Sequence, residues 1–329
     1  MESVESVESV ESVGSMETMV SDGRPATRSS PGPASLRRYV VWALLAAALY
    51  ALSTPVAKTL LDDAEPGVLA ALLYLGAGGG MAVIALLRAL PAGGRQGHGA
   101  RSLSRQDLPY VVVMVGLDIL APILLLFGLD RAEAANVALL NNFEIVATTV
   151  IAALLFGERH DLRLWVGIGT ITAACALLSL DGGGALRFST GSVLVLAAAS
   201  CWGLENNCTQ RISDKDPVQI VIVKGLGSGS GALVVAALAG ERVPGASTIG
   251  ISLLLGFLAY GLSITLYVAA QRGLGAARTA AFYAVAPFIG AGLSWVLFRT
   301  APGPAFLLAV VLMAVGSRLV MPTEQSSSR

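Results

Sequence analysis

Two stretches of the chain, AAALYALSTPVAKTLLDDAEP (residues 46–66) and AAASCWGLENNCTQRISDKDP (residues 197–217), align without a gap when one is shifted by 151 residues. The same shift aligns YLGAGGG (74–80) with GLGSGSG (225–231). Small residues and the final proline recur at matching positions, whereas Glu205 of the second stretch has the uncharged Thr54 as its counterpart. The sequence therefore indicates an internal duplication that divides the chain into two halves.

The composition predicts that both halves lie in a membrane. Of the 329 residues, 54% are hydrophobic and only 13% are charged, about half the charged fraction of a typical soluble domain. Apolar runs of about 20 residues, each long enough to cross the hydrocarbon core of a bilayer, recur along most of the chain. We therefore expect an all-α integral membrane protein with ten transmembrane helices. These occupy residues 39–61, 66–90, 108–129, 132–156, 162–180, 191–212, 217–240, 247–269, 274–298 and 302–321.

The ten spans divide evenly between the halves. The first repeat is expected at 39–181 and the second at 190–321, with five helices each. Toward the end of each half the best shift falls from 151 to 142 residues, a difference of nine, because the first half has a longer loop between its second and third spans. Since five is odd, the repeats enter the membrane in opposite directions. Inverted repeats are typical of secondary transporters, whose substrate sites lie near the midplane between the repeats.

The positive charges predict the orientation. If the N-terminus is cytoplasmic, sixteen Lys and Arg residues lie on the cytoplasmic side and five on the opposite side, with Lys224 inside a span. This bias predicts that both termini are cytoplasmic and that the protein resides in the cell membrane, plasma or inner. Residues 1–38, which begin with ESVESVESVESV, are expected to form a disordered tail. Residues 322–329 form a C-terminal tail, and Met1, Met16 and Met19 all remain candidate start sites.

Four ionisable groups lie well inside the predicted spans: Asp118, Glu144, Glu205 and Lys224. Counting about 1.5 Å per residue from the nearest turns places all four in one layer near the midplane. Such groups are costly in hydrocarbon and usually face a bundle interior or a water-filled cavity. We therefore expect substrate or proton binding by these groups and their polar neighbours. The expected site residues are Asp118, Asn141, Asn142, Glu144, Thr148, Glu205, Asn206, Asn207 and Lys224.

Within this layer two arrangements are expected. Glu205 and Lys224 have equal depth on adjacent helices and form an ion pair, which is either purely structural or part of the site. Glu144 and Asp118 are expected to lie together without a cation, so that one of them holds a proton. Three acids and one base carry an excess of two negative charges, which a proton, a sodium ion or a cationic substrate would balance.

The two five-helix halves resemble the drug/metabolite transporter superfamily, EamA type. AANVALLNNFEIVATTVIAALLFGE (134–158) resembles the fourth helix of that family, and AARTAAFYAVAPFIGAGLSWVLF (276–298) resembles its ninth, including Pro287. CWGLENNCTQRISDKDPVQIVIVKGLGSGSG (201–231) resembles the sixth and seventh helices of one bacterial branch. The first half departs from the commoner pattern because Ile145 stands where Pro287 has its counterpart. The resemblance implies an exporter or exchanger of small metabolites.

Several other functions are disfavoured by the residue content. His98 and His160 lie in polar connections, so a catalytic or metal-binding His inside the membrane is not expected, and no cofactor or metal is implied. No basic block predicts nucleic-acid binding. We expect a transporter of a small polar metabolite that works by alternating access and is coupled to protons, with sodium as an alternative ion and a homodimer left open. An intramembrane enzyme and a non-transporting scaffold or receptor are the competing hypotheses.

Overall fold

The computed structural model describes residues 33–89, 103–156, 161–179, 189–212, 215–274, 279, 282–299 and 303–320, and in these ranges it contains helices and no β-strand. The expected tail overlaps them only at residues 33–38, which form the start of the first helix. The first half contains α1 (Pro33–Ala51), α2 (Ser53–Leu60), α3 (Pro66–Ala89), η1 (Arg105–Asp107), α4 (Leu108–Asp130), α5 (Ala134–Leu140), α6 (Phe143–Phe156) and α7 (Leu162–Ser179). The second half contains α8 (Thr190–Arg211), α9 (Pro217–Ala239), α10 (Ala246–Gly256), the π-helical segment η2 (Phe257–Leu262), α11 (Ser263–Leu274), α13 (Ala286–Phe298) and α14 (Pro304–Val320).

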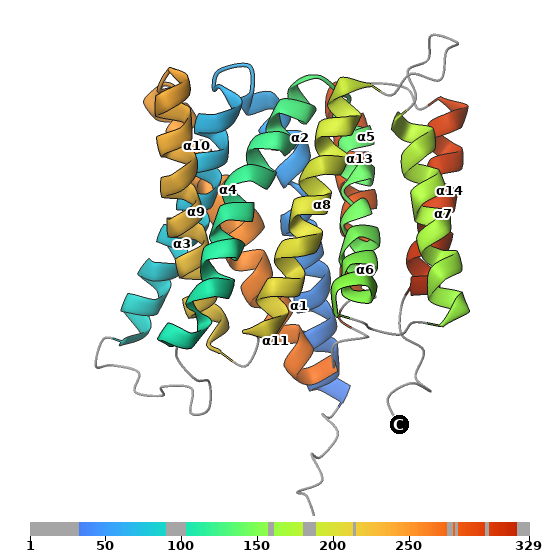
Figure 1. Cartoon of the computed structure of the whole chain (residues 1–329), viewed down its shortest axis with the longest axis horizontal. Helices are drawn as coiled ribbons and strands as arrows, with labels where there is room; N and C mark the ends of the chain where they lie inside the picture. The colour runs from blue at the N-terminus through green and yellow to red at the C-terminus, as the bar shows by residue number, and fades with distance from the viewer. Residues whose placement is uncertain are drawn as a thin grey trace, which may run out of the picture.

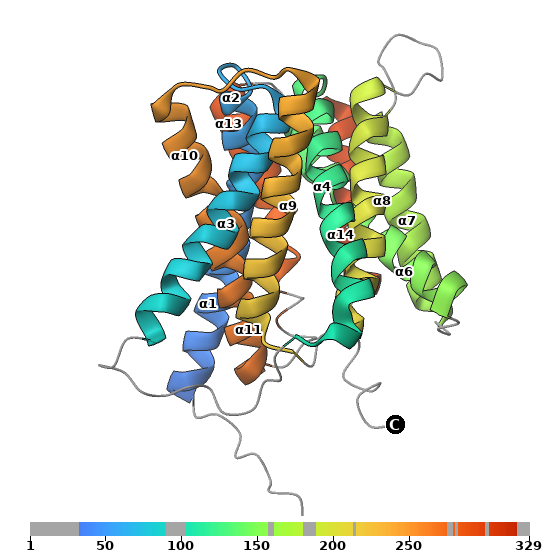
Figure 2. The same cartoon turned by 60° about the vertical axis from the view of Figure 1, so that its left-hand side comes forward.

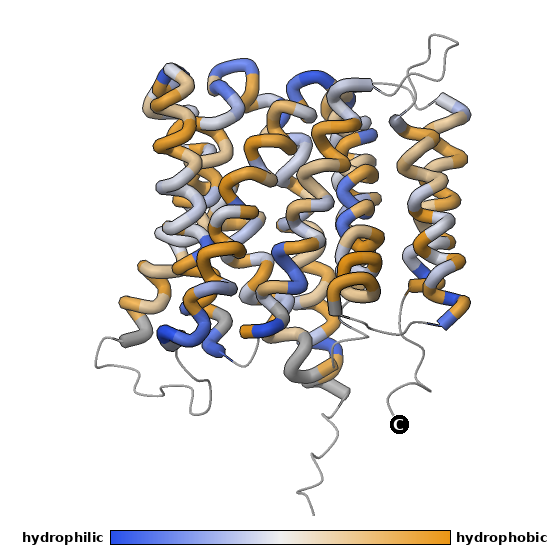
Figure 3. Tube along the Cα trace, viewed as in Figure 1, coloured by the Kyte–Doolittle hydropathy of each residue, from blue (hydrophilic) through white to orange (hydrophobic). Residues whose placement is uncertain are grey.

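The helices form a bundle in which α3, α9 and α10 occupy one end and α7 and α14 the other (Figure 1). Helix α1 begins and α14 ends on the same side of this bundle (Figures 1 and 2). Hydrophilic residues gather near the two ends of the helices, and a smaller number lie at mid-height (Figure 3). This distribution suits a bundle that crosses a bilayer and carries a polar site inside it.

The described helices are apolar enough to make this a multi-pass membrane protein. Seven helical segments are long and apolar enough to cross a membrane, and α13 and α14 are shorter apolar helices. Helix α8 has 22 residues, compared with 24 in α3 and 23 in α9. It ends in the polar run ENNCTQR (205–211), which lowers its hydropathy.

Three runs that were expected to form one helix each are broken. In the run 274–298 a turn at residues 284–285 precedes α13. In the run 39–61 the break lies at Leu52, because Pro55 has no N–H to donate to the carbonyl of Ala51 four residues earlier. In the run 132–156 the break lies at Asn141 and Asn142, between α5 and α6. The expectation of continuous helices was wrong at all three places. The breaks at Leu52 and Asn141 lie inside the bundle, so they expose backbone groups where a site can use them.

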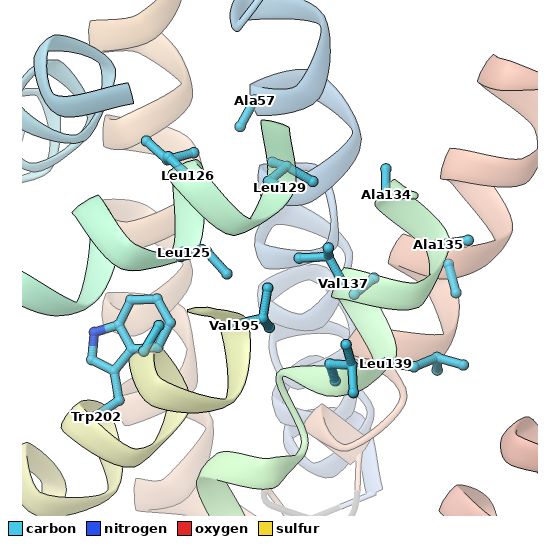
Figure 4. Close-up of a cluster of buried hydrophobic side chains, with 14 of the residues drawn as sticks. Ala57, Leu125, Leu126, Leu129, Ala134, Ala135, Val137, Leu139, Val195 and Trp202 are labelled. Atoms are coloured by element: carbon cyan, nitrogen blue, oxygen red, sulfur yellow. The ribbon is translucent and has the colours of Figure 1, made fainter. Parts of the chain in front are cut away.

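A hydrophobic core holds α4, α5 and α8 together (Figure 4). Leu125 and Leu129 of α4, Val137 of α5, and Val195 and Trp202 of α8 are buried in it. Asp118 lies two turns before Leu125, and Glu205 lies one turn after Trp202. The core therefore fixes the two helices that carry these carboxylates.

Extensive helix contacts join the two halves: among them, α3 packs on α9, α4 on α8, α7 on α14, α1 on α11 and α5 on α13. The α3–α9 contact is close because glycines face each other. A Cβ atom at Gly78 would lie 2.7 Å from the carbonyl carbon of Gly225. The two glycine-containing stretches that align in the sequence, 74–80 and 225–231, therefore pack closely on each other.

This contact gives a testable prediction. Gly78→Ala should destabilise the protein by about 1–3 kcal/mol, because the added methyl group overlaps the backbone of α9. Gly79→Ala is the matched control, since nothing lies within 4 Å of a Cβ at Gly79. Alanine favours a helix over glycine, so the control should be neutral or stabilising. Thermal unfolding of the two variants in detergent measures the difference, and equal unfolding temperatures would contradict the close packing.

Candidate functional site in the membrane layer

The break between α5 and α6 places Glu144 at the start of a helix. The backbone N–H groups of Asn142, Glu144 and Ile145 bond the carbonyls of Leu139, Asn141 and Asn142, at 3.0, 3.1 and 3.0 Å, each three residues back. The side-chain amide of Asn142 also donates to the carbonyl of Leu139, at 3.1 Å. Asparagine often competes with the helix backbone in this way. Glu144 therefore lies in the first turn of α6, where the helix dipole favours a negative charge.

Glu144 contacts α8 through an amide. The Nδ2 atom of Asn206 donates to Oε1 of Glu144 at 2.6 Å and lies 3.5 Å from Oγ1 of Thr148. The Nδ2 atom of Asn207 donates to the carbonyls of Thr148, at 3.0 Å, and Gly203, at 2.8 Å. Asn206 thus binds the carboxylate of Glu144, whereas the side chain of Asn207 links α8 to the backbone of α6.

Lys224 of α9 joins two carboxylates. Its Nζ atom lies 2.9 Å from Oε2 of Glu205 on α8 and 3.2 Å from Oδ2 of Asp118 on α4. The two acidic side chains are 1% and 0% exposed, and that of Lys224 is 21% exposed. The hydroxyl of Thr209 donates to the other oxygen of Glu205. The predicted Glu205–Lys224 ion pair is confirmed, and Asp118 makes it a cluster of three charges.

Asp118 is not the partner of Glu144, and the expectation that no cation neutralises it was wrong. Besides the contact with Lys224, Oδ1 of Asp118 accepts a hydrogen bond from the hydroxyl of Tyr74 at 3.1 Å. Trp202 in turn donates its Nε1–H to that hydroxyl at 3.2 Å. Equal depth fixes the height of a residue in the membrane but not the side of the helix on which it lies. Helix α4 packs on α8 and α9, whereas α6 packs on α8 and α7.

Glu144 keeps a carboxylate without a cation. In the described ranges no Lys or Arg is recorded within ion-pair distance of it, whereas Asp118 and Glu205 share Lys224. If all three acids are ionised, the layer carries two negative charges in excess, one in the three-charge cluster and one at Glu144. This arrangement can bind a proton or a positively charged group at Glu144.

A row of tyrosines begins at the three-charge cluster. The ring centroids of Tyr74 and Tyr260 are 5.8 Å apart, those of Tyr260 and Tyr50 are 6.0 Å apart, and those of Tyr50 and Tyr283 are 5.7 Å apart. Tyr283 also contacts Tyr267 at 4.9 Å. The hydroxyl of Tyr74 donates a hydrogen bond to Asp118. One end of the row therefore contacts the three-charge cluster.

Tyr50 and Tyr74 were missed in the sequence. Each lies inside an apolar run, where an aromatic ring is easily taken for packing. The available signal was their distance from the span ends, because a buried tyrosine hydroxyl usually needs a polar partner. The hydroxyl of Tyr74 has two such partners, Asp118 and Trp202.

A small hollow lies beside this row, where the break between α1 and α2 meets α5 and α13. Its lining residues are Tyr50, Ala51, Ser53, Thr54, Ala138, Asn141, Ala286, Pro287 and Gly290. Asn141 is 9% exposed, and its Oδ1 atom is buried without a hydrogen-bond partner. Of the predicted site residues, Asn141 therefore lies at this hollow, whereas the amide of Asn142 binds its own backbone.

Comparison with known proteins points to one family. The EamA-like transporter family matches the chain twice, over residues 37–180 and 189–321. A relative described as an uncharacterized transporter, from Methanothermobacter thermautotrophicus (strain Delta H), is 26% identical over 280 residues, covering 78% of each chain. A protein of known crystal structure aligns with a TM-score of 0.60 and 18% identity over 90% of this chain and 99% of its own, a likeness of fold alone.

The family and the relative both indicate a transporter rather than an enzyme. The two matched regions together span most of the chain and meet near the junction between α7 and α8. They include every helix that contributes to the charged layer. The chain belongs to the EamA-like transporter family, within the drug/metabolite transporter superfamily.

Proposed function

We propose that the protein is a secondary transporter that exports or exchanges a small polar metabolite by alternating access, coupled to protons through Glu144. The observation that carries this proposal is the polar layer inside the bundle, in which Glu144 has an amide partner and, among the described residues, no Lys or Arg within ion-pair distance. A carboxylate held in this way can take up a proton on one side of the membrane and release it when substrate binds on the other.

The proposal includes ten spans arranged as two inverted five-helix repeats. The helix contacts support it, because α3–α9, α5–α13 and α7–α14 each pair a span with its counterpart in the other half. The same two-fold relation converts the contact of α4 with α8 into the contact of α1 with α11. The turns before α6 and α13 also correspond, since Asn142 and Ala284 differ by the repeat shift of 142.

The side chains at mid-height support movement of one group of helices against another. Lys224 and Tyr74 come from the closely packed pair α9 and α3, whereas Asp118, Glu205 and Trp202 come from α4 and α8. Their contacts thus tie one helix pair to the other. Substrate or proton binding that alters these contacts changes how the two pairs sit together. With both termini cytoplasmic in the cell membrane, as the Lys and Arg distribution predicts, the layer is reached alternately from either side.

Solute flux tests this function. Purified protein is reconstituted into liposomes that contain a pH-sensitive dye, and amino acids, nucleosides and small organic acids are added one at a time. We expect at least one of these solutes to change the internal pH in liposomes that contain the protein. Protein-free liposomes, which should show no change, are the control. If no solute causes flux or a pH change, the transporter proposal is wrong and a scaffold or receptor role gains support.

A further inference from the structure

Two helix breaks meet at the small hollow beside the tyrosine row, and the hollow belongs to neither the three-charge cluster nor Glu144. Ser53 and Thr54 begin α2, Asn141 follows α5, and Pro287 and Gly290 lie in the first turns of α13. The first three side chains are 5%, 6% and 9% exposed. Helices from both halves of the chain therefore surround one small space whose lining includes three buried polar side chains.

At residues that line this space, the breaks leave carbonyl oxygens without their usual helical donors. The Oδ1 atom of Asn141 is buried and has no hydrogen-bond partner. The carbonyl of Ala138 loses its usual donor, because the N–H of Asn142 bonds Leu139 instead, at 3.0 Å. The carbonyl of Ala51 loses its usual donor to Pro55. A Cβ atom on Gly290 would lie 3.2 Å from that carbonyl oxygen, so the oxygen lies close against the backbone of α13.

The chemistry of these oxygens selects the ligand. Amide, carbonyl and hydroxyl oxygens are hard, neutral ligands that suit a cation. No carboxylate lines the hollow, and divalent cations in proteins are usually held by carboxylates. In transporters, unwound backbone carbonyls and the C-terminal ends of half-helices coordinate sodium. Ala51 and Ala138 lie at the ends of such half-helices.

We propose that this hollow binds a sodium ion through the side-chain oxygen of Asn141, the hydroxyl of Thr54 and the carbonyls of Ala51 and Ala138. The bound ion joins α1, α2 and α5 of the first half to the α13 side of the second. Its binding is a property of the folded chain, whereas its role as a second coupling ion rests on the proposed transport function.

Thermal unfolding of the purified full-length protein tests the site without a substrate. We expect sodium chloride to raise the Tm by about 2–4 °C over the same concentration of choline chloride, since a ligand of the native state stabilises it. Potassium chloride should have a smaller effect. Asn141→Leu and Thr54→Val should both lose the sodium-dependent rise, because each removes one of the proposed ligands.

Thr172→Val is the matched control for Thr54→Val, because the hydroxyl of Thr172 donates to the carbonyl of Ile168 on its own helix and Thr172 does not line the hollow. It should keep the full sodium-dependent rise. An equal rise with sodium, potassium and choline, or a rise that Thr54→Val retains, would overturn the proposal even if Asn141→Leu does not fold. Sodium-dependent stabilisation in a protein that moves no solute would uphold the ion site and contradict the transport function.

Discussion

Lys224→Met is expected to destabilise the protein by about 3 kcal/mol or more, the largest loss of stability among the substitutions considered. The side chains of Asp118 and Glu205 are 0% and 1% exposed, and Lys224 is within 3.2 Å of both. Without the ammonium group, two carboxylates remain buried with no cation. Removing one partner of a buried ion pair typically costs about 3–5 kcal/mol. Thermal and denaturant unfolding in detergent measure the loss.

Variants that remove other charges of the three-charge cluster are the controls for this prediction. Asp118→Asn or Glu205→Gln alone leaves Lys224 paired one to one and should cost less than Lys224→Met. The triple variant Asp118→Asn, Glu205→Gln and Lys224→Met removes all three charges and should recover much of the lost stability. Val223→Met, next to Lys224 on α9, controls for the methionine side chain. A triple variant as unstable as the sum of its three single changes would show that the charges do not act together.

The duplication, the helical class and the polar layer were predicted from the sequence because they depend on position along the chain. The glycine pattern, for example, survives in both halves and corresponds to the close contact between Gly78 and Gly225. The Glu205–Lys224 pair was also predicted, since equal depth on consecutive antiparallel helices brings two side chains together. These features follow from spacing along single helices and from the order of the spans.

The features that were wrong or missed depend on how helices are rotated and interrupted. Equal depth in the membrane led us to expect Asp118 and Glu144 to be neighbours. Asp118 instead lies on the side of α4 that meets α9 and Lys224. The break at Asn141 interrupts an apolar run that contains no proline or glycine, so hydropathy did not reveal it. Pro55 was a visible signal for the break at Leu52. Tyr74 became recognisable only when Asp118 and Trp202 were found around its hydroxyl.

Glu144→Gln is expected to abolish proton-driven transport while leaving substrate exchange measurable. Glutamine has the shape of a protonated glutamate but cannot release a proton. It also keeps an oxygen that can accept from Asn206, which lies 2.6 Å from the carboxylate. The substitution should therefore preserve the fold and the contact with α8. Substrate–substrate exchange requires no net proton movement, so it should continue in the variant.

Transport driven by an imposed pH gradient tests this central claim most directly. Proteoliposomes of the native protein, of Glu144→Gln and of Glu133→Gln are compared with the solute identified by the flux assay. Glu133 is an exposed residue before α5, so its substitution controls for the loss of a carboxylate. We expect gradient-driven accumulation with the native protein and with Glu133→Gln, and none with Glu144→Gln. Undiminished gradient-driven accumulation by Glu144→Gln would contradict the assignment of Glu144 as the proton-carrying group.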